Sequence, residues 1–358
     1  MAAQTNVQVG GSSAKSRQFK YDFVRFVAMT WVIGVHALTV VDTGRRLGSW
    51  YVVLCQAVFF TANAIFFMLS GKFNLVRKNS EDWRGFYVRK ARGILLPVLV
   101  LFFIRTAYDM WPDLGTPLHF LKTFALNTVD YFDCREYWFV FQLLSMLVVT
   151  PFLVPVVESL DVESLDQGKK KLLMVLGLLW FTASFFMTNL GYELGYSFMF
   201  GGFWFAYLIG PFVEGLLSHA LHQRLIVLAG VLAPLATLVA VLCGYSSGAF
   251  DTSPFYLITY VGLYCLLLWL GDRVVPSLRR PISFCARHSF TVYMIHMMVL
   301  IPLSAAVPKL YGVASLAEHV GLSVLTIAIC VLLSALLDTL LIKPLQRLFD
   351  ILAQKLAK

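Results

Sequence analysis

The sequence predicts an all-α fold, a polytopic transmembrane helical bundle of about ten spans with both termini in the cytosol. Of the 358 residues, 59% are hydrophobic and only 14% are charged, against roughly 45–50% and 25% in soluble domains. Apolar runs of about 20 residues, enough to cross a bilayer as a helix, recur along the chain. Basic residues concentrate in alternate loops between these runs. The mean hydropathy of +0.74 leaves no room for a sizeable aqueous domain.

The apolar runs follow one another without a long polar interruption. Residues 1–18, rich in Ser, Gly, Gln and Lys, predict a disordered cytosolic tail. The first run, Phe23 to Val41, lacks a signal-peptide cleavage site, so we expect it to be retained as a helix. Turn residues separate the later runs. The ten spans are expected at 20–42, 50–74, 85–110, 136–157, 171–189, 198–217, 225–244, 254–271, 283–306 and 320–345.

The distribution of basic residues orients the bundle. With a cytosolic amino terminus, 22 of the 29 Lys and Arg residues face the cytosol and five face the opposite side. Arg25 and Arg105 remain within or at the edge of spans. The positive-inside rule therefore places both termini in the cytosol and explains the net charge of +9 without a nucleic-acid partner. The six cysteines show neither a disulfide framework nor metal-ligand spacing, so no metal site is expected.

Arg25 and His36 are the leading candidates for chemistry because ionisable groups inside a bilayer are costly and need a reason. They are eleven residues apart, which leaves about 20° of rotation after three helical turns, so they share one helix face. The axial offset is about 16 Å, which puts Arg25 near the cytosolic boundary and His36 about halfway across. The alternatives are an interfacial anchor for Arg25 and a packing role for His36.

Two further clusters lie near the expected cytosolic boundary. Arg89 and Arg92, spaced i, i+3, adjoin Lys90 and concentrate positive charge suited to phosphate groups. The alternative is a positive-inside anchor. Ser70-Gly71, after an aromatic apolar run, is expected to end the second span, either as a turn whose backbone amides touch a ligand or as a simple helix cap.

Other polar residues are weaker candidates. Arg105 and Asp109, spaced i, i+4, are expected to form an ion pair. Glu136 lies at the outer boundary, where it is a candidate for contact with an acceptor or with the base. We expect packing or interfacial roles for Trp138 and a polar-network or helix-packing role for Asn63. The remaining histidines are assigned no chemistry: His119, His219, His222, His288, His296 and His319.

Several of these residues form a pattern that resembles the integral-membrane acyltransferase 3 family. The pattern begins with Asp22-x-x-Arg25, ten residues and His36. It continues with Phe66-Phe-Met-Leu-Ser70-Gly71-x-Phe73, Arg89-x-x-Arg92 with Pro97, Tyr137-Trp-Phe and Tyr293-Met-Ile-His296. The order and spacing of these motifs match over nearly all ten spans.

The resemblance implies transfer of an acyl group, usually acetyl, from cytosolic acyl-CoA to a hydroxyl of a glycan or lipid-linked saccharide. It assigns catalysis to Arg25 and His36. Acyl-CoA binding falls to Arg89, Arg92, Ser70 and Gly71, to which Lys90 adds charge. Imidazole suits the role of general base because its pKa lies near the operating pH. Candidate acceptor or supporting residues are Glu136, Trp138, Asn63 and Asp22.

The expected organisation is a single acyltransferase membrane domain at 19–350 between the amino-terminal tail and a cytosolic tail at 351–358. The expected location is the cytoplasmic (inner) membrane. No tightly bound cofactor is expected; acetyl-CoA or another short acyl-CoA is the co-substrate, and polysaccharide-assembly proteins are candidate partners. Succinyl transfer remains open. So do a transporter or flippase, which buried charges also suit, and a non-catalytic partner of a polysaccharide synthase.

Overall fold

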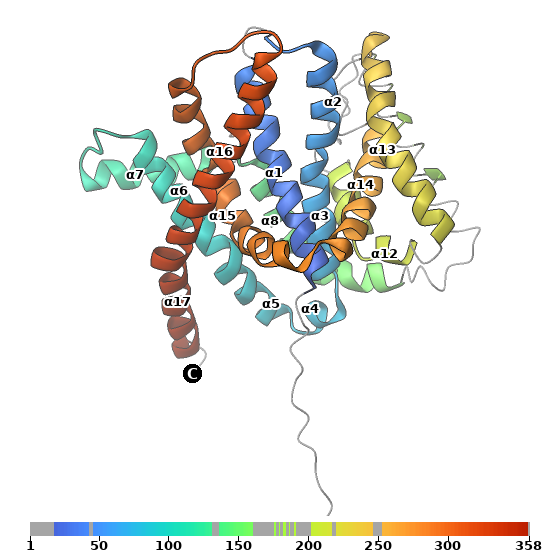
Figure 1. Ribbon diagram of the computed structural model, residues 1–358. Coiled ribbons are helices and arrows are strands. Elements are labelled where there is room, and N and C mark those ends of the chain that lie inside the picture. Colours follow the sequence, from blue (N-terminus) through green and yellow to red (C-terminus); the bar gives the residue numbers. More distant parts are fainter. Residues whose placement is uncertain are drawn as a thin grey trace, which may run out of the picture.

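The computed structural model describes residues 18–42, 46–130, 136–159, 175–176, 179, 182–183, 186, 190, 202–216, 220–245 and 253–356. All regular structure in these residues is helical, arranged as a bundle (Figure 1). Within this part of the chain, eight continuous helical stretches are long and apolar enough to cross a membrane. They are Phe19–Val41, Ser49–Asn74, Trp83–Asp109, Trp138–Glu158, Ala220–Leu242, Pro254–Arg273, Pro276–Ala306 and Ala314–Lys355. The predicted polytopic helical bundle is confirmed.

Two of the ten expected spans, 171–189 and 198–217, are not among these eight stretches. The span at 171–189 lies largely outside the described residues. In the described part of the span at 198–217, the prediction of one continuous helix is wrong, because α11 (Gly202–Ile209) and the short α12 (Val213–Leu216) are separated by a turn. The turn contains Gly210 and Pro211. Proline has no backbone N–H to continue a helix.

Helix α1 (Phe19–Val41) lies at the centre of the bundle. It packs against α14 (Pro254–Arg273), α15 (Pro276–Ala306) and α16 (Ala314–Leu337), and also contacts α2 (Ser49–Phe59) and α3 (Thr61–Asn74) (Figure 1). Its buried positions include several small residues, which let neighbouring helices approach closely. Any side chain that α1 turns inward therefore meets residues from several distant parts of the sequence.

The second span forms α2 and α3 and ends at Asn74, in agreement with the expected bounds 50–74, but the expected turn or cap at Ser70-Gly71 is wrong. Helix α3 continues to Asn74, and the N–H of Leu75 donates to the carbonyl of Gly71 over 2.8 Å. Gly71 instead allows a close helix contact, because a Cβ atom built there would lie 1.8 Å from the backbone oxygen of Tyr207 in α11. The small residue is required by packing between α3 and α11.

The third span is segmented. A short α4 (Arg77–Glu81) precedes α5 (Trp83–Lys90), a π-helical turn η1 (Ala91–Leu95) and α6 (Leu96–Asp109). Pro97 is the second residue of α6, just after the π turn, where its missing N–H interrupts the regular α-helical ladder. The following α7 (Pro117–Asp130) was not expected, and its Phe120 and Phe124 rings contact Phe103 of α6 at centroid distances of 4.9 and 5.5 Å.

The other helices complete the bundle. Helix α8 (Trp138–Ser159) contacts α3, α4, α5 and α11, and α13 (Ala220–Leu242) packs along α14. After α16, a second π turn, η3 (Asp338–Ile342), leads into α17 (Lys343–Leu356). Helix α17 extends away from the bundle (Figure 1) and includes residues 351–356, which we had assigned to a tail.

Candidate functional site

Arg25 and Asp22 form a polar group near the amino-terminal end of α1. Arg25 Nη1 lies 3.3 Å from Asp22 Oδ1, and its guanidinium lies over the ring of Phe73, 5.2 Å from the centroid. Asp22 is buried, with 1% exposure, and its Oδ2 accepts a hydrogen bond of 2.9 Å from Ser283 Oγ of α15. Because a buried carboxylate needs compensating partners, this group links α1, α3 and α15.

His36 lies further along α1 and contacts a second histidine. The imidazoles of His36 and His296 have centroids 4.9 Å apart and planes tilted by 47°. His296, on α15, is 1% exposed. Its Nδ1 lies 2.5 Å from the backbone oxygen of Tyr293, and because a carbonyl oxygen only accepts, Nδ1 carries the proton. Nε2 then carries a lone pair, and it has no hydrogen-bond partner among the described residues.

A charged network lies beside the two histidines. Arg105 Nε donates to both carboxylate oxygens of Asp109 at 2.8 Å, which confirms the expected ion pair. Arg105 Nη1 also donates to Glu136 Oε1 at 2.7 Å. Glu136 lies next to α15, because Tyr293, three residues before His296, donates to its backbone oxygen. Arg105 therefore holds the Glu136 carboxylate in place next to the helix that carries His296.

Two hydrogen bonds join the residues just before α8 to α15, the helix that carries His296. Tyr293 Oη donates to the backbone oxygen of Glu136, and Tyr137 Oη donates to the backbone oxygen of Met294 over 3.0 Å. Tyr137 and His296 are both buried, at 1% exposure. These bonds hold the segment just before α8 against α15, so the position of Glu136 is fixed relative to His296.

A family model described as an acyltransferase domain matches residues 19–335. The chain belongs to the acyltransferase 3 family. The matched region begins with α1 and ends within α16, so it contains the Arg25–Asp22 group, the histidine pair and the Glu136 network. A comparison with curated proteins and one with solved structures gave no match.

Within this acyltransferase, the basic residues of the third span are bound to carboxylates. Arg89 Nη1 lies 2.8 Å from Asp82 Oδ2, and Arg92 Nε lies 2.7 Å from Asp350 Oδ1 of α17. The Lys90 ammonium lies over the Phe86 ring, 5.3 Å from the centroid. The two arginines, which share a sequence motif, therefore engage different elements: Arg89 the start of α5, and Arg92 the terminal helix.

Asp82 caps α5 at the expected cytosolic face. Its carboxylate accepts from Arg89 and, over 3.0 Å, from the backbone N–H of Gly85. The hydrogen bond from Arg89, supported by that from Gly85, holds the pKa of Asp82 below its ordinary value. Asp82 is exposed, so this interaction orders the helix start locally and adds little to the stability of the bundle.

The remaining expected site residues have mainly packing surroundings. Ser70 Oγ accepts a 3.0 Å hydrogen bond from Asn74, and Gly71 faces α11 as described above. Trp138 is part of an aromatic cluster, with its ring 5.0 Å from that of Phe203. Asn63 lies half-buried on α3. These positions support the walls around the site, whereas the ionisable side chains in direct contact are His36 of α1 with His296 of α15, and Arg105 of α6 with Glu136.

His296 was not expected to take part in the chemistry, although it belongs to the Tyr293-Met-Ile-His296 motif. A histidine inside an apolar span is by itself an indication of a functional role. Only the fold shows that the ring of His296 contacts that of His36. Two other histidines have structural partners. His288 Nδ1 lies 2.5 Å from Asp338 Oδ2, and His319 connects Tyr51 Oη with the backbone oxygen of Gly34, each at 2.8 Å.

Proposed function

We propose that the protein is a membrane O-acyltransferase that moves an acyl group, most simply acetyl, from cytosolic acyl-CoA to a hydroxyl of an envelope or exported glycan. The proposal places it in the cytoplasmic membrane, with a lipid-linked saccharide as a further form of the acceptor. Membership of the acyltransferase 3 family supports the reaction class. The observation that carries the catalytic assignment is the contact between His36 and the buried His296 inside the helical bundle.

The chemistry needs a base at the hydroxyl. The acceptor oxygen attacks the thioester carbonyl, the new C–O bond forms, the C–S bond breaks, and coenzyme A leaves as a thiolate. His36 accepts the hydroxyl proton during attack and returns a proton to the leaving thiolate, so the imidazole ends the cycle neutral. An imidazole is suited to both steps because it gains and loses a proton near neutral pH.

His296 supports this role as a positioning residue. Its Nδ1 proton is committed to the carbonyl of Tyr293, which leaves Nε2 with a lone pair on a ring that contacts the ring of His36. In the proposed mechanism the His296 ring, fixed by this hydrogen bond, packs against His36 and holds the imidazole of His36 in position. Arg25, about 16 Å along the same helix face, holds the donor end of the site through its charge.

The test uses purified full-length protein in detergent with radiolabelled acetyl-CoA and an envelope saccharide fraction. His36→Ala and Arg25→Ala are expected to abolish transfer while leaving the amount of membrane-extracted protein unchanged. His119→Ala, which removes an exposed histidine of α7, is the matched control and should retain wild-type activity. Full activity of His36→Ala would refute the assigned base.

The same assay separates the other functions. Consumption of acyl-CoA in detergent, with no second compartment, excludes a purely translocating transporter. A wild-type protein that binds no acyl-CoA would instead support a non-catalytic partner of a polysaccharide synthase. Parallel reactions with acetyl-CoA and succinyl-CoA identify the acyl group. Mass spectrometry of surface glycans from cells with and without the gene identifies the acceptor.

A further inference from the structure

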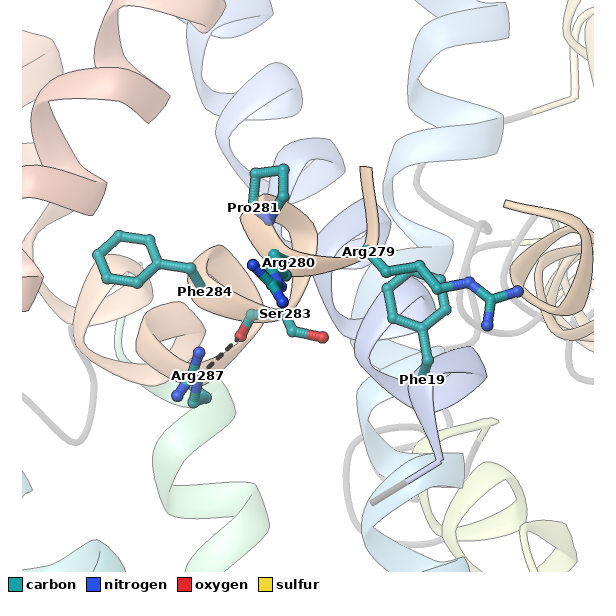
Figure 2. Close-up of a pocket in the computed structure, with 7 residues that line it drawn as sticks. All are labelled: Phe19, Arg279, Arg280, Pro281, Ser283, Phe284 and Arg287. Atoms are coloured by element: carbon teal, nitrogen blue, oxygen red, sulfur yellow. Dashed lines mark hydrogen bonds between the residues drawn. The ribbon is translucent and has the colours of Figure 1, made fainter. Parts of the chain in front are cut away.

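A basic pocket lies where α15 begins, beside the amino-terminal end of α1 (Figure 2). Its volume is about 710 Å³, within the range of sites that hold small ligands. Its lining combines three arginines with two aromatic rings, a serine and a proline: Arg279, Arg280, Arg287, Phe19, Phe284, Ser283 and Pro281. None of the lining residues is acidic, and none was among the expected site residues.

The three arginines differ from the other candidate cations in their partners. In the described part of the chain, Arg279, Arg280 and Arg287 form no ion pair with a carboxylate, whereas Arg89 and Arg92 each do. Two acidic groups lie next to the pocket: Asp272 lines an adjoining pocket with Lys20 and Arg279, and Asp22, which is paired with Arg25, accepts a hydrogen bond from Ser283. The α15 pocket therefore offers positive charge that the protein does not itself neutralise.

Two of the arginines are held in place by backbone oxygens. Arg279 Nε donates to the oxygen of Val274 over 3.0 Å and Arg279 Nη2 to that of Asp272 over 3.4 Å, while its guanidinium lies 5.3 Å from the centroid of the Phe19 ring. Arg287 Nε donates to the oxygen of Ser283 over 3.1 Å, drawn in Figure 2. A fixed guanidinium loses less side-chain entropy on binding an anion than a mobile one.

The pocket is joined to the candidate site through one side chain. Ser283, which lines the pocket, donates to Asp22, and the other oxygen of Asp22 is paired with Arg25. A ligand in the pocket therefore lies near Arg25, at the amino-terminal end of the helix that also carries His36. The rings of Phe19 and Phe284 supply apolar surfaces on which a planar base can stack.

We propose that the α15 pocket binds the phosphate-rich nucleotide end of the acyl-CoA donor. The proposal rests on the proposed function. Arg279, Arg280 and Arg287 bind the phosphate groups by charge-assisted hydrogen bonds, and the pantetheine arm runs from the pocket along α1 toward His36. An anionic phospholipid, like acyl-CoA, presents a phosphate group next to an apolar portion. The experiment must therefore distinguish a bound coenzyme from a bound lipid.

The experiment uses full-length protein in nanodiscs of phosphatidylcholine alone and of phosphatidylcholine with phosphatidylglycerol. Binding of acetyl-CoA, 3′-dephospho-CoA and acetyl-pantetheine is measured without acceptor, and KM and kcat are measured with acceptor. The variants are Arg280→Gln, Arg287→Gln and the triple Arg279→Gln/Arg280→Gln/Arg287→Gln. Arg347→Gln, which removes an exposed cation of α17, is the matched control.

The wild type is expected to bind acetyl-CoA more tightly than 3′-dephospho-CoA. Each single variant should raise the Kd and KM for acetyl-CoA about tenfold, the usual effect of losing one charge-assisted hydrogen bond. The triple variant should no longer distinguish the two coenzymes. Binding of acetyl-pantetheine, kcat at saturating donor and the Arg347→Gln control should be unchanged.

Three results would overturn the assignment. One is wild-type affinity for acetyl-CoA in the triple variant. A second is a triple variant that binds acetyl-CoA normally but whose KM and kcat no longer differ between nanodiscs with and without phosphatidylglycerol, as those of the wild type do. That result would identify the pocket as a site for a lipid headgroup. The third is absence of acetyl-CoA binding by the wild type, which rejects the proposed donor together with the pocket. Donor binding that depends on the three arginines in a protein without transferase activity would uphold the pocket and reject the proposed function.

Discussion

The imidazole rings of His36 and His296 lie with centroids 4.9 Å apart, although the residues belong to the first and one of the last membrane-spanning helices. Helices α1 and α15 pack along each other, which brings the rings together. The contact gives the general base proposed for this acyltransferase a neighbour whose own proton is already committed to a backbone oxygen. A base alone on α1 would lack this fixed acceptor.

His296→Phe is expected to lower kcat by about 10²-fold or more, in the range of acid–base contributions, with little change in the KM for acyl-CoA. The substitution removes the Nε2 lone pair but keeps a ring to pack against His36. His296→Gln, which retains an acceptor, should recover part of the rate. Steady-state kinetics of purified protein tests this, with the pH–rate profile as a second readout. Unchanged kcat and pH profile in His296→Phe would show that the second ring only fills space.

The contact between α3 and α11 depends on the absence of a side chain at Gly71. Gly71→Ala should destabilise the bundle by about 1–3 kcal/mol, as overpacked cores are, because the added Cβ would lie 1.8 Å from the Tyr207 oxygen. Gly321→Ala in α16 is the matched control, since no atom lies within 4 Å of its added Cβ. That control should be neutral or slightly stabilising. Thermal unfolding in detergent is the measurement. An unchanged Tm with a raised KM for acyl-CoA would favour a ligand contact at Gly71 instead.

A buried ion pair closes the bundle on the side we expect to face away from the cytosol. Arg46 Nη1 and Nη2 donate to Glu318 at 2.6 and 3.0 Å, and the two side chains are only 5% and 6% exposed. Glu318→Ala is expected to cost about 3–5 kcal/mol because it leaves a buried cation unpaired. The double variant Arg46→Met/Glu318→Leu should recover most of that loss. Equal Tm values for Glu318→Ala and the double variant would contradict the argument.

The start of α5 should respond to acid. The pKa of Asp82 is depressed in the folded protein, chiefly by Arg89. The stabilisation that the Asp82 carboxylate gives to the start of α5 is therefore fully present above the unfolded-state pKa of about 4. It is lost as the pH falls through the lower folded-state pKa. Hydrogen exchange of the Gly85 amide, measured relative to the intrinsic rate, should lose protection over that acidic range. In Asp82→Asn the protection should no longer vary with pH there. An identical pH dependence in the variant would assign the effect to another group.

The sequence by itself determined the class of the protein. Apolar runs of bilayer length, basic loops on alternate sides and an ordered set of motifs are local or linear properties, so they predicted the helical bundle, the family and Arg25 with His36 as candidates. Local geometry also predicted the Arg105–Asp109 pair, because residues four apart on a helix are neighbours.

Only the tertiary structure decided which distant groups meet. The contacts of His36 with His296, of Asp22 with Ser283 and of Arg105 with Glu136 depend on how separate helices pack, which no spacing within one helix specifies. Packing also explains two differences from the sequence-based expectations. Residue 71 is a glycine within a helix because the close approach of α11 leaves no room for a side chain. Gly210-Pro211 ends a helix within an apolar run that hydrophobicity alone predicts to be one span. Hydrophobicity fixes which segments enter the membrane, whereas side-chain shape and hydrogen bonding fix their neighbours.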